Sequence, residues 1–173
     1  MPNWIEGTFR FRGSKENVKK FIMEGLKPVS NFGCEEKFQS TIKFEEDEYI
    51  EIKFTLNNQN EDSKKKYPDY LYIPHTHRHF VKLDSYGYIS SQSCKKNNDL
   101  VFATNFKAAW SIDTEAIVQV AKEFQIDIRV NGYERGMEFE QLLEVDRNGV
   151  IKCDRDIEYT DYIWECSMPL LGG

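Results

Sequence analysis

Hydrophobic and polar residues alternate strictly near the start of the chain. Between Ile5 and Arg12, Phe9 and Phe11 fall on one side of an extended backbone. Arg10 and Arg12 fall on the other side. A period of two is typical of a strand with one buried face. The pattern therefore predicts a half-buried first strand.

Two later segments have the period of an amphipathic helix. Ser14 can cap the first helix and Pro28 should stop it, because proline disfavours a helical conformation in the residue before it. The apolar residues of this helix are Val18, Phe21, Ile22 and Leu26. Either Ser111 or Asp113 can cap the second helix. Its apolar residues are Ile117, Val120, Ala121 and Phe124.

Most of the remaining chain alternates as strands do. Two runs on either side of an acidic turn predict a β-hairpin, at residues 38–44 and 49–56. Single strands are expected at residues 70–73, 79–83, 86–90, 100–106 and 126–130. We expect Asn131-Gly132 to end the last of these, and residues 138–145 and 150–159 to form a closing hairpin. The polar residues 57–68 predict a loop, and the apolar tail 162–173 should lie along the core.

The order strand, helix, strands, helix, strands predicts an α+β fold of ferredoxin-like type. Such a fold has an antiparallel sheet with two helices on one face, here with an inserted β-hairpin. A chain of 173 residues suits a single domain, residues 1–173. The inserted hairpin and its loop would occupy about residues 35–70.

No targeting segment is evident in the chain. No run approaches the roughly 18 apolar residues that cross a bilayer, and the first residues lack the basic start of a signal peptide. We therefore expect a cytoplasmic protein with no membrane partner. The four cysteines are widely spaced, which predicts reduced thiols rather than a zinc ribbon or a disulfide scaffold.

Three segments carry a family resemblance. Residues 1–21 read M-P-N-W-I-E-G-T-F-R-F-R-G-S-K-E-N-V-K-K-F, residues 102–117 read F-A-T-N-F-K-A-A-W-S-I-D-T-E-A-I, and residues 133–139 read Y-E-R-G-M-E-F. These segments resemble the YubB-like proteins of phages and plasmids, which have a ferredoxin-like domain. The resemblance implies a mobile-element origin and action in the cytoplasm of a host cell. Small acidic proteins of such origin are often host-defence antagonists, such as anti-CRISPR proteins, and the resemblance implies no catalytic residues.

Charge is segregated along the chain, although the net charge is -6. Residues 63–107 carry eight bases and three acids, interleaved with tyrosine and phenylalanine. Such a mixture can neutralise phosphates and stack on bases, or its aromatic residues can simply fill a core. The candidate nucleic-acid-binding residues are Lys64, Lys65, Lys66, Arg78, Lys82, Lys95 and Lys96.

The last third of the chain is strongly acidic. Residues 108–173 carry fourteen acids and six bases. These carboxylates could imitate phosphates and occupy a basic channel on a partner protein. They equally suit a solvated sheet edge, which charged side chains protect from aggregation.

The three histidines of the chain lie within five residues, as His75, His77 and His79. In an extended segment this alternation would point all three imidazoles to one side. One could then take the 2′-hydroxyl proton of RNA while another protonates the leaving oxygen. A metal would need a further ligand that no second motif supplies, so we expect neither a metal nor a cofactor. The alternative is that they are ordinary polar residues of an edge strand.

These observations favour a binding protein over an enzyme. The leading hypothesis is a phage or mobile-element accessory protein that binds and inhibits a bacterial defence complex, with an RNA-guided nuclease as its target. One alternative is a ribonuclease-like enzyme that trims guide RNA through His75, His77 and His79. Another is a structural or regulatory phage protein that self-associates.

Overall fold

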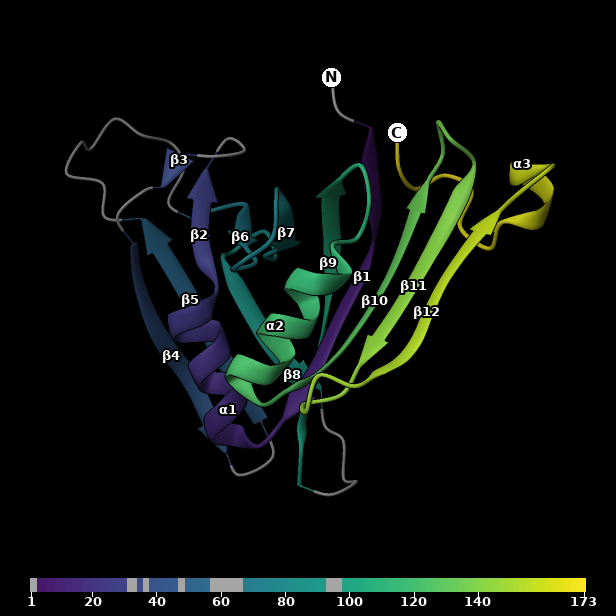
Figure 1. The fold of residues 1–173 in the computed structure, drawn as a ribbon. Helices are drawn as coiled ribbons and strands as arrows, with labels where there is room; N and C mark the ends of the chain where they lie inside the picture. Colours follow the sequence, from purple (N-terminus) through teal and green to yellow (C-terminus); the bar gives the residue numbers. More distant parts are fainter. Residues whose placement is uncertain (1–2, 31–33, 36–37, 47–48, 57–66, 93–97) are drawn as a thin grey trace, which may run out of the picture.

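A large, curved antiparallel sheet dominates the fold (Figure 1). The computed structural model describes residues 3–30, 34–35, 38–46, 49–56, 67–92 and 98–173. The strands are β1 (Trp4–Gly13), β2 (Lys27–Ser30), β3 (Cys34–Glu35), β4 (Phe38–Glu46), β5 (Tyr49–Leu56), β6 (Tyr70–Tyr72), β7 (His79–Lys82), β8 (Tyr88–Gln92), β9 (Leu100–Ala109), β10 (Asp127–Glu134), β11 (Phe139–Val145) and β12 (Ile151–Glu158). The helical segments are α1 (Lys15–Lys20), the π-helical turn η1 (Phe21–Gly25), α2 (Thr114–Phe124) and α3 (Tyr162–Glu165).

The strand order is β12-β11-β10-β1-β9-β7-β6-β2-β3, and β9 is the point at which the sheet divides. The C-terminal half of β9 pairs with β7, where Phe106 lies opposite Val81. Its N-terminal half pairs with β8, where Phe102 lies opposite Ser91. Strand β8 then pairs with β5, and β5 with β4. One long strand thus supports two branches of the sheet.

The predicted ferredoxin-like α+β fold is wrong, because the molecule is mostly antiparallel sheet and not a compact two-helix ferredoxin-like fold. The hairpin of β4 and β5 exists as predicted. However, β5 joins the branch that begins at β9. Periodicity shows which face of a strand is buried, but it does not show which strand pairs with which.

The predicted first strand is confirmed as β1, which has β9 on one side and β10 on the other. Phe9 and Phe11 are buried on the face that the helices cover. Arg10 and Arg12 are exposed on the opposite face. We call the helix-covered side the inner face and the other side the outer face.

The first helix begins as predicted, since the Ser14 hydroxyl accepts a hydrogen bond from the Asn17 backbone N–H. It ends at Gly25, however, and Pro28 lies inside β2 instead of stopping the helix. A β-carbon on Gly25 would lie 2.7 Å from the Phe124 ring. Glycine therefore lets the end of the first helical segment approach α2 closely.

Helix α2 is capped by Asp113, one of the two predicted caps. Its carboxylate accepts a hydrogen bond from the Ala116 backbone N–H at 3.0 Å. The predicted apolar face is buried, with Ile117 and Val120 fully enclosed. Gln125 ends the helix in the left-handed conformation, with a φ of 52°.

Strand β10 passes through Asn131-Gly132 and ends at Glu134, so the predicted strand end is wrong. A β-carbon on Gly132 would lie 2.2 Å from a methyl carbon of Ile5. Glycine is needed here for close packing under Ile5 and not for a turn. The closing hairpin is confirmed as β11 and β12, and Gly149 in its turn has a φ of 79°.

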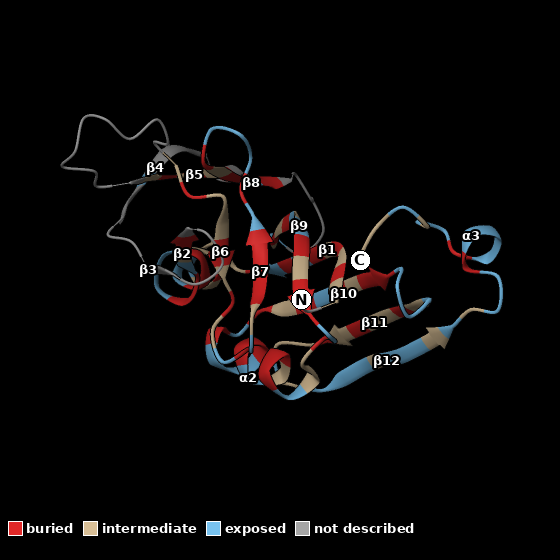
Figure 2. Cartoon of the chain, turned by 90° about the horizontal axis from the view of Figure 1, so that it is seen from above, coloured by how far each residue is buried: buried red, intermediate tan, exposed pale blue. Residues whose placement is uncertain are grey.

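One core joins both branches of the sheet to the helices. Strand β5 contributes Ile50, Ile52 and Phe54 to it. Figure 2 shows β7 buried in the middle of the molecule, while β12 and α3 are largely exposed. None of the helices in the described ranges has the length and apolar character needed to span a bilayer.

The C-terminal tail follows the core only in part, in contrast to the prediction for residues 162–173. Tyr162 and Cys166 are buried against Tyr133. The Trp164 side chain is 86% exposed and that of Leu170 is 82% exposed. The tail ends at β1, where the Gly173 N–H donates to the Trp4 carbonyl at 3.0 Å and Glu6 accepts from the neighbouring N–H.

Candidate functional site

The histidine segment is a turn and not the extended segment that the prediction assumed. His75 and Arg78 both have left-handed backbone conformations, with φ of 64° and 60°. The Nε2 atom of His75 lies 2.6 Å from a carboxylate oxygen of Glu123 in α2. The His77 side chain is exposed. The period-two argument for three imidazoles on one side therefore does not apply here.

His79 is buried and fully occupied by hydrogen bonds. Its Nε2 atom accepts from the Asp113 backbone N–H at 2.9 Å, so the proton resides on Nδ1. Nδ1 then donates to the His77 carbonyl at 2.9 Å. Burial lowers the pKa of His79, which keeps the imidazole neutral. The side chain is placed to hold the first turn of α2 against β7.

The predicted basic residues are only partly within the described ranges. Lys64, Lys65, Lys66, Lys95 and Lys96 lie outside them. The Arg78 guanidinium lies 5.1 Å from the centre of the Trp4 ring, in cation–π geometry. Lys82 is exposed on the outer face of β7. The structure therefore brings Arg78 and Lys82 to the same side of the sheet.

Aromatic side chains gather next to these cations. Phe80 lies 5.9 Å from Tyr72, 6.1 Å from Tyr70 and 6.4 Å from Trp4, measured between ring centres. Phe80 is buried, whereas Trp4, Tyr70 and Tyr72 are half-buried. Lys107 approaches the same Trp4 ring at 4.8 Å and forms an ion pair with Glu6 at 2.8 Å. The cluster is thus closely packed and partly open to solvent.

The outer face also has hollows along β9. One of about 310 Å³ lies where Arg10, Arg12 and Arg129 converge. A second, of about 270 Å³, is lined by Tyr70 and Lys82 among others. A third, of about 230 Å³, continues from Lys82 toward β8. Helices α1 and α2 lie on the opposite face (Figure 1), whereas Met168 and Leu171 of the C-terminal tail help to line the second hollow.

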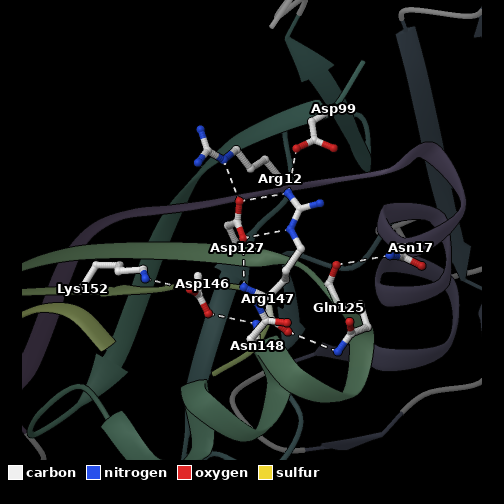
Figure 3. A network of polar contacts seen from close by, with 9 residues as sticks. All are labelled: Arg12, Asn17, Asp99, Gln125, Asp127, Asp146, Arg147, Asn148 and Lys152. Atoms are coloured by element: carbon white, nitrogen blue, oxygen red, sulfur yellow. Dashed lines mark hydrogen bonds and ion pairs between the residues drawn. The ribbon is translucent and has the colours of Figure 1, made fainter. Parts of the chain in front are cut away.

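A network of charged residues closes one end of the sheet (Figure 3). The Asp127 carboxylate accepts hydrogen bonds from Arg12 at 2.9 Å and from the Arg147 side chain at 3.0 and 3.1 Å. Arg147 also donates to Asp99 at 2.7 Å. The turn between β11 and β12 is thereby joined to the start of β9 and β10.

The network fixes the ionisation of its central carboxylate. Burial raises the pKa of Asp127, but hydrogen bonds from Arg147 and Arg12 outweigh burial and lower it to about 2. The same carboxylates raise the pKa of Arg147. Both groups are therefore charged at neutral pH and serve as a clamp between strands.

The edge strand β12 presents a different arrangement of charge. Asp154, Asp156 and Glu158 lie on one face of the strand and are exposed. Asp154 accepts a hydrogen bond from Thr114 at 3.3 Å, and Asp156 accepts one from Gln141 at 2.9 Å. In the described part of the chain, none of the three has a cationic partner. We call these three residues the acidic edge.

A tyrosine cluster under the tail was not anticipated from the sequence. The Tyr159 hydroxyl donates to Glu140 at 2.6 Å, and its ring packs edge-on against Tyr162 at 5.5 Å. Burial raises the pKa of both phenols, and the hydrogen bond with Glu140 adds to the shift of Tyr159. Neutral phenols and the buried Cys166 suit a structural role. Their convergence depends on the path of the tail, which periodicity does not reveal.

Within the described ranges, no three His, Cys, Asp or Glu side chains gather in a group that could hold a metal ion. The arrangement is better suited to binding than to acid–base chemistry, because the buried imidazole and phenols are occupied and the exposed charges lie on open surfaces. No protein-family model, curated protein or solved structure matches this chain.

Proposed function

We propose that this chain is a binding protein that attaches to a basic, nucleic-acid-binding surface of a partner protein and blocks it. The acidic edge and the apolar segment that follows it are the surface that would make this contact. The observation that carries the proposal is the direct succession of exposed carboxylates and exposed large apolar residues in residues 151–170. The family resemblance suggests an RNA-guided bacterial defence nuclease as the partner class.

The acidic edge supplies regularly spaced negative charge. Alternate residues of a strand are about 7 Å apart, so Asp154, Asp156 and Glu158 form a row on one face. Glu115 is exposed in the first turn of α2, and its neighbour Thr114 donates to Asp154. A row of unpaired carboxylates complements a groove of lysine and arginine and speeds association with it.

The segment after β12 supplies apolar anchors. Trp164 in α3 is 86% exposed, and Ile163 beside it is 62% exposed. Large apolar residues that remain this exposed mark interaction sites, and tryptophan is enriched among interface hot spots. The backbone at α3 is nevertheless fixed, because Asp161 caps the helix and Tyr162 is buried. The anchor is therefore presented on a defined support.

The test is binding to purified RNA-guided nucleases, followed by a target-cleavage assay. We expect retention of a nuclease and loss of cleavage as the concentration of this chain rises. The variant Asp156→Asn/Glu158→Gln should bind about tenfold more weakly at low salt, because two attractive charges are lost. The matched control is Glu16→Gln/Glu24→Gln, which removes two exposed charges on the first helical segment and should bind normally.

Three results would contradict the proposal. Unchanged cleavage and no retention with nucleases of several types would remove the partner class. Equal loss of binding in the two double variants would remove the acidic edge as the contact. Concentration-dependent dimers that disappear in Trp164→Ala would instead assign the apolar segment to self-association.

A further inference from the structure

The outer face of the sheet forms a second surface, separate from the acidic edge. Side chains that point outward from β1 run from Trp4 to Arg12, over about 27 Å of strand. The 310 Å³ hollow lies beside Arg10 and Arg12, and the 270 Å³ hollow lies beside Thr8. The two hollows therefore lie one after the other along the same strand.

Two arginines face each other across this surface. Arg10 of β1 lies directly opposite Arg129 of β10. Like charges in this position destabilise a sheet. Arg129 is 3.6 Å from Glu144, and both side chains are about half exposed. The ion pair with Glu144 therefore neutralises Arg129 only weakly. Arg10 has no acidic partner among the described residues, and an anion bound between the two arginines would relieve their repulsion.

The remaining charges on this face leave an excess of cations. Glu6 is paired with Lys107, and Asp127 is held by Arg12 and Arg147. Lys82 is exposed and, like Arg10, has no acidic partner in the described ranges. The neutralised carboxylates do not repel a polyanion strongly, while Arg10 and Lys82 remain available to it.

Aromatic rings accompany these cations. Tyr70 and Lys82 are cross-strand neighbours and both line the 270 Å³ hollow. Tyr70 is half-buried and is supported from one side by Phe80. A fixed, partly exposed ring beside a lysine is the arrangement on which the bases of a single strand stack.

We propose that the outer face binds single-stranded nucleic acid, with Arg10 and Lys82 contacting phosphates and Tyr70 stacking on a base. Helices α1 and α2 lie on the inner side of the curved sheet, so the outer face is its convex side (Figure 1). A flexible single strand can follow a convex face through successive hollows, whereas a stiff duplex touches it only locally. The contact does not depend on the acidic edge, because β12 is separated from β1 by β11 and β10.

The test is fluorescence anisotropy with a labelled single-stranded RNA of about 12 nucleotides, its DNA counterpart and the matching duplex, in low salt. We expect the single strands to bind and the duplex to bind at least tenfold more weakly. Arg10→Ala/Lys82→Ala should weaken single-strand binding by about tenfold to a hundredfold. It should also reduce the slope of log affinity against log salt by about 1.4, since each phosphate contact contributes about 0.7.

The control variant is Lys20→Ala/Arg135→Ala, which removes two exposed cations, one in α1 and one in the turn between β10 and β11. It should bind as the unaltered protein does. Tyr70→Leu should weaken binding while Tyr70→Phe preserves it, because only the latter retains a stacking ring. Thermal unfolding confirms that each variant is folded.

Several results would overturn the proposal. They are no binding of single strands at about 100 µM protein in low salt, tighter binding of the duplex, or equal losses in the two double variants. The nuclease assay of the preceding section is read with variants of the acidic edge, whereas strand binding is read with variants of Arg10, Lys82 and Tyr70. Failure of one proposal therefore leaves the other standing.

Discussion

The clamp around Asp127 and the acidic edge of β12 both contain aspartate side chains, yet the two regions differ in what surrounds each carboxylate. Asp127 is half-buried and receives hydrogen bonds from two arginines. Asp156 is exposed and accepts one hydrogen bond, from the uncharged Gln141. Charges that are paired within the chain hold strands together, while charges left without a counterion can meet one on another molecule. The comparison separates residues that stabilise the fold from residues proposed to bind a partner, and either set can be substituted alone.

The largest effect is expected at the apolar end of the binding segment. Trp164→Ala should weaken binding to the nuclease by about 30-fold or more, corresponding to a hot-spot loss of at least about 2 kcal/mol. The side chain is 86% exposed, so the free energy of unfolding should change little. Isothermal titration calorimetry and urea denaturation measure the two quantities.

Tyr86→Ala provides the matched control for this prediction, because Tyr86 is 65% exposed and lies in the turn before β8, a strand that pairs with β5 and β9 and not with β12. It should leave binding unchanged. A similar loss in both variants would mean that the nuclease does not recognise Trp164 specifically.

For the clamp we expect the reverse of the Trp164 result, with the main effect on the free energy of unfolding. Asp127→Asn should lower the free energy of unfolding by about 2 kcal/mol, because Arg147 and Arg12 lose their shared carboxylate. Asp156→Asn should change it by less than about 0.5 kcal/mol. Urea denaturation of both variants gives the comparison directly, and equal destabilisation would show that the paired and unpaired carboxylates do not differ.

The clamp also predicts how stability depends on pH. The pKa of Asp127 is about 2 in the folded chain and close to 3.8 when unfolded. Between these values the unfolded state binds more protons, so stability falls as pH decreases. Its contribution should be complete above about pH 5 and should disappear progressively toward about pH 2. Urea midpoints measured from pH 5 to pH 2 should show a component of about 2 kcal/mol that is missing in Asp127→Asn.

Local features of this fold could be predicted from the sequence because they depend on neighbouring residues. The alternation around Phe9 gave β1, and Ser14 and Asp113 were both identified as helix caps. Strand pairing could not be predicted in this way. The division of β9 between β7 and β8 is a long-range arrangement, and it produces a branched sheet where a ferredoxin-like sheet with an inserted hairpin is expected.

The candidate sites show the same limit. The histidine pattern predicts an extended segment, but left-handed residues at His75 and Arg78 make it a turn. The acidic character of residues 108–173 was evident, whereas its concentration on one face of β12 required the register with β11. The facing pair Arg10 and Arg129 could not be found without knowing that β1 pairs with β10. Sequence reasoning therefore identified charges but not their partners.

The smallest predicted effect is a gain in stability. Arg10→Thr should raise the free energy of unfolding by about 0.3–0.5 kcal/mol, because it removes the like-charged neighbour of Arg129 and places a β-branched residue in a central strand. Urea denaturation at low salt is the measurement, and the gain should shrink at high salt because the repulsion is screened. Arg135→Thr, in an exposed turn, is the control and should have no such gain. Destabilisation by Arg10→Thr at every salt concentration would show that Arg10 contributes to the fold. The pair of Arg10 and Arg129 would then not be a site at which the chain loses stability in favour of binding an anion.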